Sequence, residues 1–555
     1  MEMKSKILIS GLIIALLSSC NDDFLTRNPL DTPSSSTFFS NEAELEMALA
    51  GVYRNLYWHS YSVPYHMWLD ACTDIAWSRG DFGDALTIQS GNYTPEWRRF
   101  ELTWQHMYEG IARANNILVN MDRAREILPE EKYLDTEAQA RFLRAYYYVY
   151  LTNLYGDVPW VDKMLTLEEA QLPRTPEGEI LDKIYEDLDF AAEHLLQPQN
   201  EGKATRDAAL TLKARAALLA GDYETAATAA GKVMDSGNYS IHPDYGELFS
   251  YAGGDSPEII FKLHNHIDVF VTQIPRYLSP RVFGGYSVLI PTQNLVDMYQ
   301  ATDGMPIDES PLYDPAHPFE NRDPRMDQTI LLPGEYINGF LFQTHPDSTQ
   351  TYQQTGTDLK RVPNPEVTNP YATFSGYLFN KYLDESDIPD RLTQSPLELI
   401  LMRYAEVLLT YAEARIELNQ IDETVINAIN QVRGRQNVQM PPVSPEMSVE
   451  ELRKTVRYER SVELALEGFR LFDIRRWKYA EHVMPGNMLG RRHKEHWSDP
   501  IVPEIDDYGH PSYPDETETF QIMSTNAFDP GRDYLWAIPQ TEINLNPNLR
   551  QNPGY

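Results

Sequence analysis

The stretch ARAALLAGDYETA, residues 214–226, decides the fold class. Small residues at Ala214 and Ala226 let two antiparallel helices approach closely, and Gly221 makes the tight link between them. This arrangement is typical of the turn in a tetratricopeptide unit. Residues 412–420 fit the same frame, with Asn419 in place of the glycine. The two stretches predict repeated helix pairs, and two unrelated helical hairpins are the alternative interpretation.

On both sides of this stretch, apolar residues recur at the spacing of a helix. A helix is expected to begin near residue 41, and further helices are expected over 96–121, 136–155, 177–196, 205–220, 222–236, 396–419, 423–437 and 448–482. The segment 238–390 is instead rich in Pro, Gly, Asn and Asp, with short strand-like runs such as 258–263, and residues 483–535 are also irregular. We therefore expect a mainly α frame with loop-rich insertions, in which the frame gives stiffness and the loops form the binding site.

The composition is that of a soluble globular chain. Its 555 residues are 42% apolar and 23% charged, enough for two to four domains or one large composite domain. Acidic residues outnumber basic ones 82 to 47, and the formal net charge is −35. This field repels phosphate backbones, which argues against nucleic acid as the main ligand. A polyanionic ligand would need a local basic patch against that background.

The first twenty residues predict export and a lipid anchor. Two lysines precede an apolar run, residues 7–17, that is too short to span a bilayer, and residues 1–19 are typical of a signal peptide. The junction Leu-Ser-Ser-Cys at 17–20 looks like a bacterial lipobox, in which cleavage precedes Cys20 and its thiol acquires diacylglycerol. An ordinary signal peptide with a chance cysteine is the alternative. The polar residues 20–40 would then be a lipidated arm.

Only two cysteines occur in the chain, Cys20 and Cys72. They cannot supply a disulfide framework or a four-thiolate metal site. If Cys20 is acylated, Cys72 is a lone thiol, which we expect to be a small buried hydrophobic residue rather than a nucleophile.

Six short segments follow one another in an order found in a known family. They include LAGVY at 49–53 behind Cys20, GIARAN at 110–115, and EAQARFLRAYYY at 137–148 with LYGDVP at 154–159. The remaining segments are 403–414, 459–477 and 538–555. Together they cover nearly the whole chain and resemble the SusD/RagB family of nutrient-binding outer-membrane lipoproteins of the Bacteroidetes type.

The resemblance implies a SusD-like fold with an N-terminal helical region over 41–237 and a RagB/SusD C-terminal region over 238–555. It also implies a lipid-anchored protein at the outer membrane, exposed on the cell surface. The acidic residues after Cys20 resemble the surface-export signal of this group. The implied partner is a SusC-like TonB-dependent barrel, which imports oligosaccharides or, in the RagB branch, peptides.

An aromatic cluster between residues 57 and 108 is the predicted ligand site. A sugar ring stacks its apolar face on a flat aromatic ring, while its hydroxyls need side chains with paired hydrogen-bonding groups. In the SusD family this segment contributes to glycan binding, and the stretch 77–95 contains Gly and Asp and reads mostly as a loop. The predicted ligand-binding residues are Asp70, Asp74, Trp77, Arg79, Tyr93, Trp97 and, from a second loop, Tyr286. Core packing is the alternative for Trp77 and Trp97, and it is the expectation for Trp104 and Tyr108.

No pattern in the sequence predicts catalysis. Acid pairs such as Asp70/Asp74 and Asp81/Asp84 arise by chance among 82 acidic residues. The acids and arginines at helical spacing over 459–476 are expected to lock helices together as an ion network, because carboxylates flanked by arginine all stay ionised.

Metal ligands are equally sparse. His264 and His266 could project from one side of a strand, but no third ligand is nearby in sequence. The acidic loop 384–390 could hold a structural calcium ion, although it lacks the Gly and terminal Glu of an EF-hand loop. We expect no metal centre and no cofactor.

The sequence thus predicts a non-enzymatic surface lipoprotein that binds oligosaccharide or polysaccharide and delivers it to a SusC-like transporter. A peptide-binding RagB-like lipoprotein is the first alternative. A surface glycoside hydrolase is the second.

Overall fold

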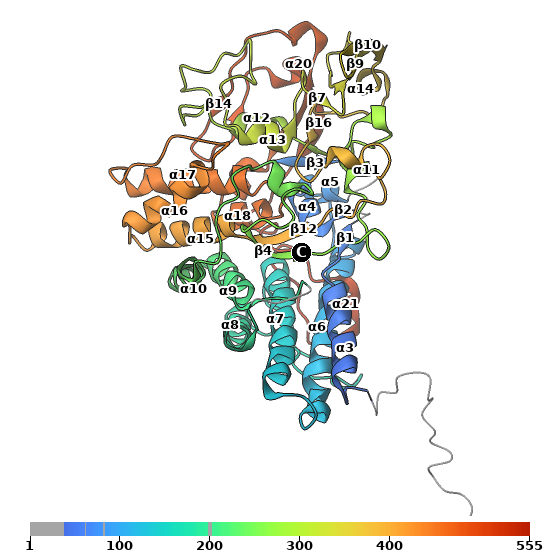
Figure 1. The fold of residues 1–555 in the computed structure, drawn as a ribbon, viewed down its shortest axis with the longest axis vertical. Coiled ribbons are helices and arrows are strands. Elements are labelled where there is room, and N and C mark those ends of the chain that lie inside the picture. The colour runs from blue at the N-terminus through green and yellow to red at the C-terminus, as the bar shows by residue number, and fades with distance from the viewer. Residues whose placement is uncertain (1–37, 61–62, 81–83, 198–201) are drawn as a thin grey trace, which may run out of the picture.

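The computed structural model describes residues 38–60, 63–80, 84–197 and 202–555. The fold is mainly α, as predicted, with short strands in the insertions (Figure 1). Cys20, the predicted arm up to residue 37, and Asp81 lie outside the described residues. Within the described ranges, no helix combines the length and the apolar character needed to cross a membrane.

Long antiparallel helices occupy the lower half of Figure 1. They are α3 (Glu42–Arg54), α6 (Arg98–Asn120), α7 (Glu130–Tyr155) and α8 (Glu177–His194), close to the predicted ranges. Gly110 on α6 faces the ring of Tyr147 on α7, and a Cβ at Gly110 would lie within 2.6 Å of that ring. Glycine is therefore required for the close approach of these two helices.

The predicted helix pairs form next to one another. They are α9 (Arg206–Ala220) with α10 (Tyr223–Ser236), and α15 (Tyr404–Glu417) with α16 (Glu423–Arg433). Gly221 ends α9 with a φ of 76°, and Asn419 follows α15 with a φ of 55°, so Asn419 does take the place of the glycine. Because α10 packs on α15, two stretches far apart in the sequence make one continuous row of helices.

Two predicted helices are wrong in part. The helix expected over 396–419 begins with β12 (Leu399–Arg403), which pairs antiparallel with β4 (Ile259–Leu263), the strand-like run noted above. All five residues of β12 are buried, and a short apolar run of this kind fits a strand as well as a helix.

The helix expected over 448–482 is broken into α17 (Val449–Glu463), α18 (Arg470–Arg476) and α19 (Ala480–Val483). The break falls at Leu466 and Gly468, which have φ values of 67° and 83°. A Cβ on Gly468 would meet the backbone of His66 at 2.8 Å, so the chain turns here against another segment.

Short elements build the insertions in the upper half of Figure 1. The helices are α4 (Tyr65–Asp70), α5 (Ala85–Gln89), α11 (Ile274–Leu278), α12 (Gln293–Met298), α13 (Arg325–Thr329), α14 (Pro365–Thr368) and α20 (Glu516–Thr519). The short helix α21 (Gln540–Leu545) is instead in the lower half of Figure 1. A four-stranded antiparallel sheet, in the order β10-β9-β8-β7, contains β7 (Tyr336–Ile337), β8 (Phe340–Leu341), β9 (Gln350–Thr355) and β10 (Asp358–Pro363). The antiparallel pairs are β1 (His59–Ser60) with β2 (Val63–Pro64), β3 (Ala76–Ser78) with β5 (Leu289–Pro291), β6 (Ile330–Leu331) with β11 (Leu378–Phe379), β13 (Gly486–Arg492) with β16 (Phe520–Asn526), and β14 (Glu504–Ile505) with β15 (Pro511–Ser512).

A buried ion network joins the helical frame to the insertions, as the sequence predicts. Glu463 at the end of α17 accepts hydrogen bonds from Arg325, Arg403 and Arg435, which come from three different segments. Burial disfavours the charge of Glu463, but the three guanidinium groups outweigh it and hold the pKa of Glu463 far below its ordinary value. The network therefore fixes the relative position of α17, β12 and α13.

Candidate ligand-binding site

Trp77 lies in the core, not on a loop. It is the middle residue of β3 and pairs with Ile290 of β5. Its side chain is 4% exposed and packs edge-on against Phe374, with ring centroids 5.4 Å apart. The stretch 77–95, expected to be mostly loop, contains the end of β3 and helix α5, which accounts for the burial.

Asp70 and Asp74 are also buried, at 0% and 1% exposure. Asp74 accepts hydrogen bonds from Nε and Nη2 of Arg470 at 2.9 and 2.7 Å. Asp70 accepts from the backbone N–H groups of Gly468 and Arg470. Burial raises the pKa of Asp70 to about 7, despite these two donors. The two aspartates thus fasten α4 to the turn before α18 and do not face a ligand.

The remaining predicted site residues fall into two separate groups. Arg79 donates to the backbone carbonyls of Tyr286 and Tyr371, and the half-buried ring of Tyr286 lies 4.3 Å below the guanidinium of Arg276. Tyr93 is buried and donates to Asp533. Trp97 is half-buried at the N-cap of α6. The structure therefore does not bring the seven predicted residues together around one accessible surface.

A different cleft, lined in part by α12, has a volume of about 460 Å³. This volume is within the range of roughly 300–1,000 Å³ that is usual for ligand pockets. We call it the aromatic cleft, because five aromatic side chains line it: Tyr313, Phe319, Tyr377, Trp497 and Tyr513. Tyr313 and Phe319 come from the connection between α12 and α13, and the other three come from three further segments.

The aromatic side chains are held in place by specific contacts. Tyr377 meets Phe319 edge-to-face, with centroids 6.1 Å apart, and its hydroxyl donates to Gln293 at 2.9 Å. Trp497 meets the ring of His345 at a centroid distance of 4.9 Å. All of these rings except Tyr513 are half-buried, so each keeps part of its surface open to a ligand.

Two glycines allow the segments that form the wall of the cleft to pack closely together. Gly490 in β13 is one, because a Cβ there would meet the carbonyl oxygens of Gln521 and Phe374 at 2.8 and 3.0 Å. Gly376 has a φ of 87°, and its Cβ position lies 3.0 Å from Arg491. Larger residues at either position would push β13 away from the neighbouring loop.

Polar groups of the aromatic cleft are mostly fixed by the protein itself. Asp297 accepts hydrogen bonds from the hydroxyl of Tyr513 at 2.7 Å and from Gln293 at 2.9 Å. Burial raises the pKa of Asp297 to about 6, although these donors act in the opposite direction. The buried hydroxyl of Thr344 has no hydrogen-bond partner within the described part of the chain.

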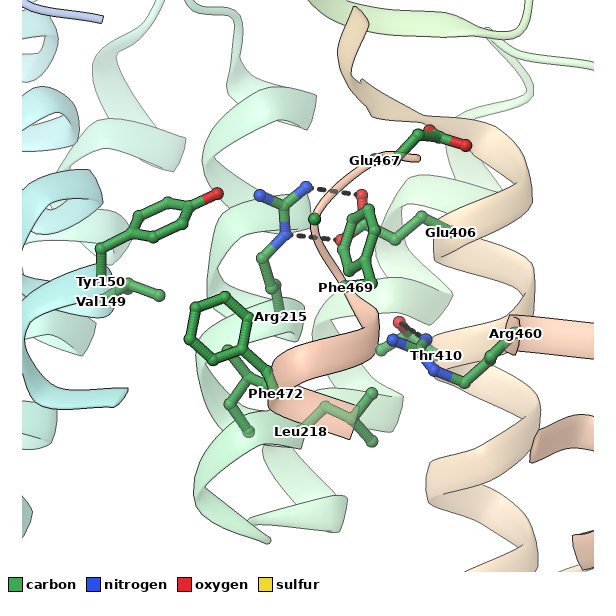
Figure 2. A pocket seen from close by; sticks show the side chains of 12 residues that line it. Val149, Tyr150, Arg215, Leu218, Glu406, Thr410, Arg460, Glu467, Phe469 and Phe472 are labelled. Carbon is green, nitrogen blue, oxygen red and sulfur yellow. Dashed lines mark hydrogen bonds and ion pairs between the residues drawn. The ribbon is translucent and has the colours of Figure 1, made fainter. Parts of the chain in front are cut away.

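A second cavity lies among α7, α9, α15 and the turn at 467–469 (Figure 2). Its volume is about 20 Å³, enough for one water molecule. Arg215 donates to both carboxylate oxygens of Glu406, at 2.6 and 2.7 Å, as Figure 2 shows. The charges lining this cavity are therefore paired, and the cavity is too small for an organic ligand.

The two metal-ligand candidates are engaged in other contacts. His264 pairs through Nδ1 with Glu398 at 2.6 Å. In the acidic loop, Asp387 accepts from the hydroxyl of Tyr251 and pairs with Arg391 at 2.8 Å. No cluster of three or more His, Cys, Asp or Glu side chains suited to a metal ion occurs in the described ranges.

Sequence reasoning missed the residues of the aromatic cleft. Its aromatic residues lie between residues 313 and 513, in segments rich in Pro, Gly or Asp and outside the predicted helices. The available signal was the occurrence of large aromatic residues in such polar segments, as with Trp497 in HWSDP at 496–500.

A row of antiparallel helix pairs that carries a loop-built aromatic cleft defines a recognition protein on a helical-repeat scaffold. Comparison with known sequences identifies the family to which the chain belongs. The sequence profile described as "SusD family" matches residues 251–555, and a second, described as "Starch-binding associating with outer membrane", matches residues 23–218. The chain belongs to the SusD family.

Relatives cover the chain from end to end. The SusD-like protein P2 of Formosa agariphila is 26% identical, and the match spans all of both chains. A crystal structure of a SusD-like carbohydrate binding protein from Bacteroides fragilis is 30% identical, with a TM-score of 0.80 over 93% of this chain and 100% of that one. A laminarin binding SusD-like protein shares the fold at 20% identity, with a TM-score of 0.67 over 93% of this chain and 100% of that one.

Proposed function

We propose that the protein binds a glycan in the aromatic cleft. The observation that carries the proposal is the group of five aromatic rings, four of them partly open, around a cleft of about 460 Å³. Stacking of sugar rings on aromatic faces together with a few hydrogen-bonding groups is sufficient for capture. The names of related proteins, a carbohydrate binding protein and a surface glycan-binding protein of Bacteroides thetaiotaomicron, support the same ligand class.

The proposed role is capture without chemistry. Glycoside hydrolysis ordinarily needs two carboxyl groups flanking the bond to be cleaved. Among the described residues lining the cleft, Asp297 is the only acid, and it is fixed by Tyr513 and Gln293. A peptide ligand, the first alternative from the sequence, would rely on main-chain hydrogen bonds and would make less use of stacked rings.

The proposed setting is the outer membrane. The lipobox ending at Cys20 would anchor the chain, and the family description "associating with outer membrane" supports this location. The resemblance to SusD/RagB proteins supports delivery of the glycan to a SusC-like TonB-dependent barrel. Co-purification of the tagged protein with such a barrel from membranes would test the partnership, and loss of membrane retention in Cys20→Ala would test the anchor.

Replacing Trp497 with alanine tests the ligand site. We expect Trp497→Ala to weaken polysaccharide binding about 5- to 100-fold in affinity electrophoresis, because a stacking surface and its buried area are lost. Trp97→Ala is the matched control, since Trp97 is also half-buried but lies at the N-cap of α6, outside the cleft. Normal binding by Trp497→Ala together with impaired binding by Trp97→Ala would instead favour the site predicted from the sequence.

A further inference from the structure

Three arginines line the aromatic cleft without a carboxylate partner. Arg322, Arg491 and Arg492 form no salt bridge with any described residue. This differs from the arginines of the buried network: Arg325 pairs with Asp323 at 2.7 Å, and Arg435 pairs with Glu258 at 2.7 Å. In a chain with 82 acidic and 47 basic residues, three unpaired guanidinium groups in one cleft call for an explanation.

Neutral groups hold these arginines in position. Arg322 donates to the backbone carbonyls of Val296, Tyr299 and Pro318 at 2.5–3.2 Å. Arg492 donates to the carbonyl of Asp499 at 2.7 Å. Carbonyl acceptors orient a guanidinium group but leave its full positive charge in place.

Arg491 is the least satisfied of the three. Its Nη1 reaches the carbonyl of Glu366 only at 3.4 Å, and its buried Nε has no hydrogen-bond partner among the described residues. A guanidinium group that is not committed to a carboxylate of the protein can donate to a carboxylate or a sulfate in a bidentate manner.

The nearby acids do not cancel this charge. Asp297 and Glu366 are both buried, and desolvation raises the pKa of the first to about 6 and of the second to about 7. Even with both carboxylates ionised, as Asp297 largely is at pH 7, the three guanidinium groups outnumber them. The cleft is thus a local basic patch in a chain whose net charge is −35, the feature that a polyanionic ligand requires.

We infer that the aromatic cleft takes an acidic glycan, whose sugar rings stack on Tyr377 and Trp497 and whose carboxylate or sulfate groups pair with Arg491 and Arg492. This inference rests on the proposed function. It adds the substrate class, because a neutral glycan would leave the guanidinium groups without a counter-ion.

Affinity electrophoresis in three polymers tests the inference: polygalacturonate for carboxylate, carrageenan for sulfate, and laminarin for a neutral chain. We expect the wild-type protein to bind one of the acidic polymers at least about 10-fold more tightly than laminarin. Raising the salt from 50 to 300 mM should weaken that binding, because the Debye length shortens and exposed ion pairs are screened. The polymer that is bound identifies the anionic group.

Arg491→Gln and Arg492→Gln should each weaken binding of the acidic polymer about 5-fold or more and reduce its salt dependence. Arg361→Gln, at an exposed arginine of β10 outside the cleft lining, is the matched control and should bind normally. If Arg491→Gln does not fold, Arg492→Gln provides the same test.

The outcomes separate the two proposals. Tighter binding of laminarin than of either acidic polymer, lost in Trp497→Ala but unchanged in both arginine variants, would overturn the acidic-glycan inference and leave glycan binding in place. Binding of no polymer in the panel would overturn both.

Discussion

Trp77 and Trp497 are the same residue type in opposite surroundings. Trp77 is 4% exposed and packs against Ile290 and Phe374, whereas Trp497 is half-buried at the edge of the aromatic cleft. We expect Trp77→Ala to lower the free energy of unfolding by about 3–5 kcal/mol, because it leaves a large cavity in a small core. Thermal melting measures this effect, and the folded fraction should bind glycan with unchanged affinity.

Trp497→Ala is the control for this prediction. It should melt close to the wild-type temperature and lose affinity. A Trp77→Ala protein with normal melting and weak binding would contradict the core assignment and return Trp77 to the ligand site.

Asp297 gives the stability of the protein a predictable pH dependence. Its pKa in the fold is about 6, against an ordinary value of 3.8, because burial disfavours the carboxylate. The folded state therefore binds more protons than the unfolded state between these values, so this group makes the protein more stable as the pH falls from about 7 to about 4. At pH 7 the cost of the buried charge is of order 2–3 kcal/mol.

Asp297→Asn should remove this contribution. We expect the melting temperature of the variant to change less between pH 5 and pH 7 than that of the wild-type protein. Asp162→Asn, at an exposed aspartate in the loop after α7, is the control and should keep the wild-type profile. Identical pH profiles for Asp297→Asn and wild type would show that Asp297 does not titrate in this range.

At the scale of elements, Arg470 connects α18 to α4. Its guanidinium donates twice to Asp74 and once to Ser461, and all three side chains are buried. Arg470→Ala leaves Asp74 as an uncompensated buried charge, so we expect a loss of about 3–5 kcal/mol in the free energy of unfolding. Denaturant titration would measure the loss.

Arg113→Ala is the matched control for Arg470→Ala. Arg113 pairs with Glu109 on the surface of α6, where both side chains are about half exposed, at 41% and 52%. Breaking that pair should cost about 0–1 kcal/mol. Equal losses of unfolding free energy in the two variants would contradict the view that Arg470 connects α18 to α4 through a buried ion pair.

Most long elements could be predicted from the sequence, and the short ones could not. The helices α6, α8, α9 and α10 lie within two residues of the predicted bounds. The helices α6, α8 and α10 have several turns of one periodic face, and α9, which is buried on most sides, ends at Gly221. The sequence predicts helix where the strand β12 forms, since its five buried residues show no alternation and its partner β4 lies about 140 residues earlier.

At the scale of the whole molecule, the proposed ligand site is the least predictable feature. The lining of the aromatic cleft comes from α12, β13 and several loops spread between residues 293 and 513, and no local pattern marks segments that meet only after folding. The sequence predicts that the loops supply the site and places Trp77 and Tyr93 in a binding loop, because aromatic residues beside Gly and Asp resemble one. They fill the core instead.

The two halves implied by the family resemblance, 41–237 and 238–555, are tied together throughout the molecule. Asp74 pairs with Arg470, and Arg215 pairs with Glu406, both in buried surroundings. At the C-terminus, Asn552 donates to the backbone carbonyl of Tyr155 at the end of α7. Separating the halves would expose the α10–α15 interface and leave charges such as Asp74 and Arg215 without partners.

We therefore expect the two halves to unfold together in one transition, with the calorimetric enthalpy of unfolding equal to the van't Hoff enthalpy. The fragment 41–237 expressed alone should lack a cooperative melt, because α9 and α10 lose the partner α15 that covers their buried face. Mixing it with the fragment 238–555 is the control, since association should restore part of the helical signal in circular dichroism. Two separate transitions in the whole chain, or a fragment 41–237 that melts sharply by itself, would show that the halves are independent domains.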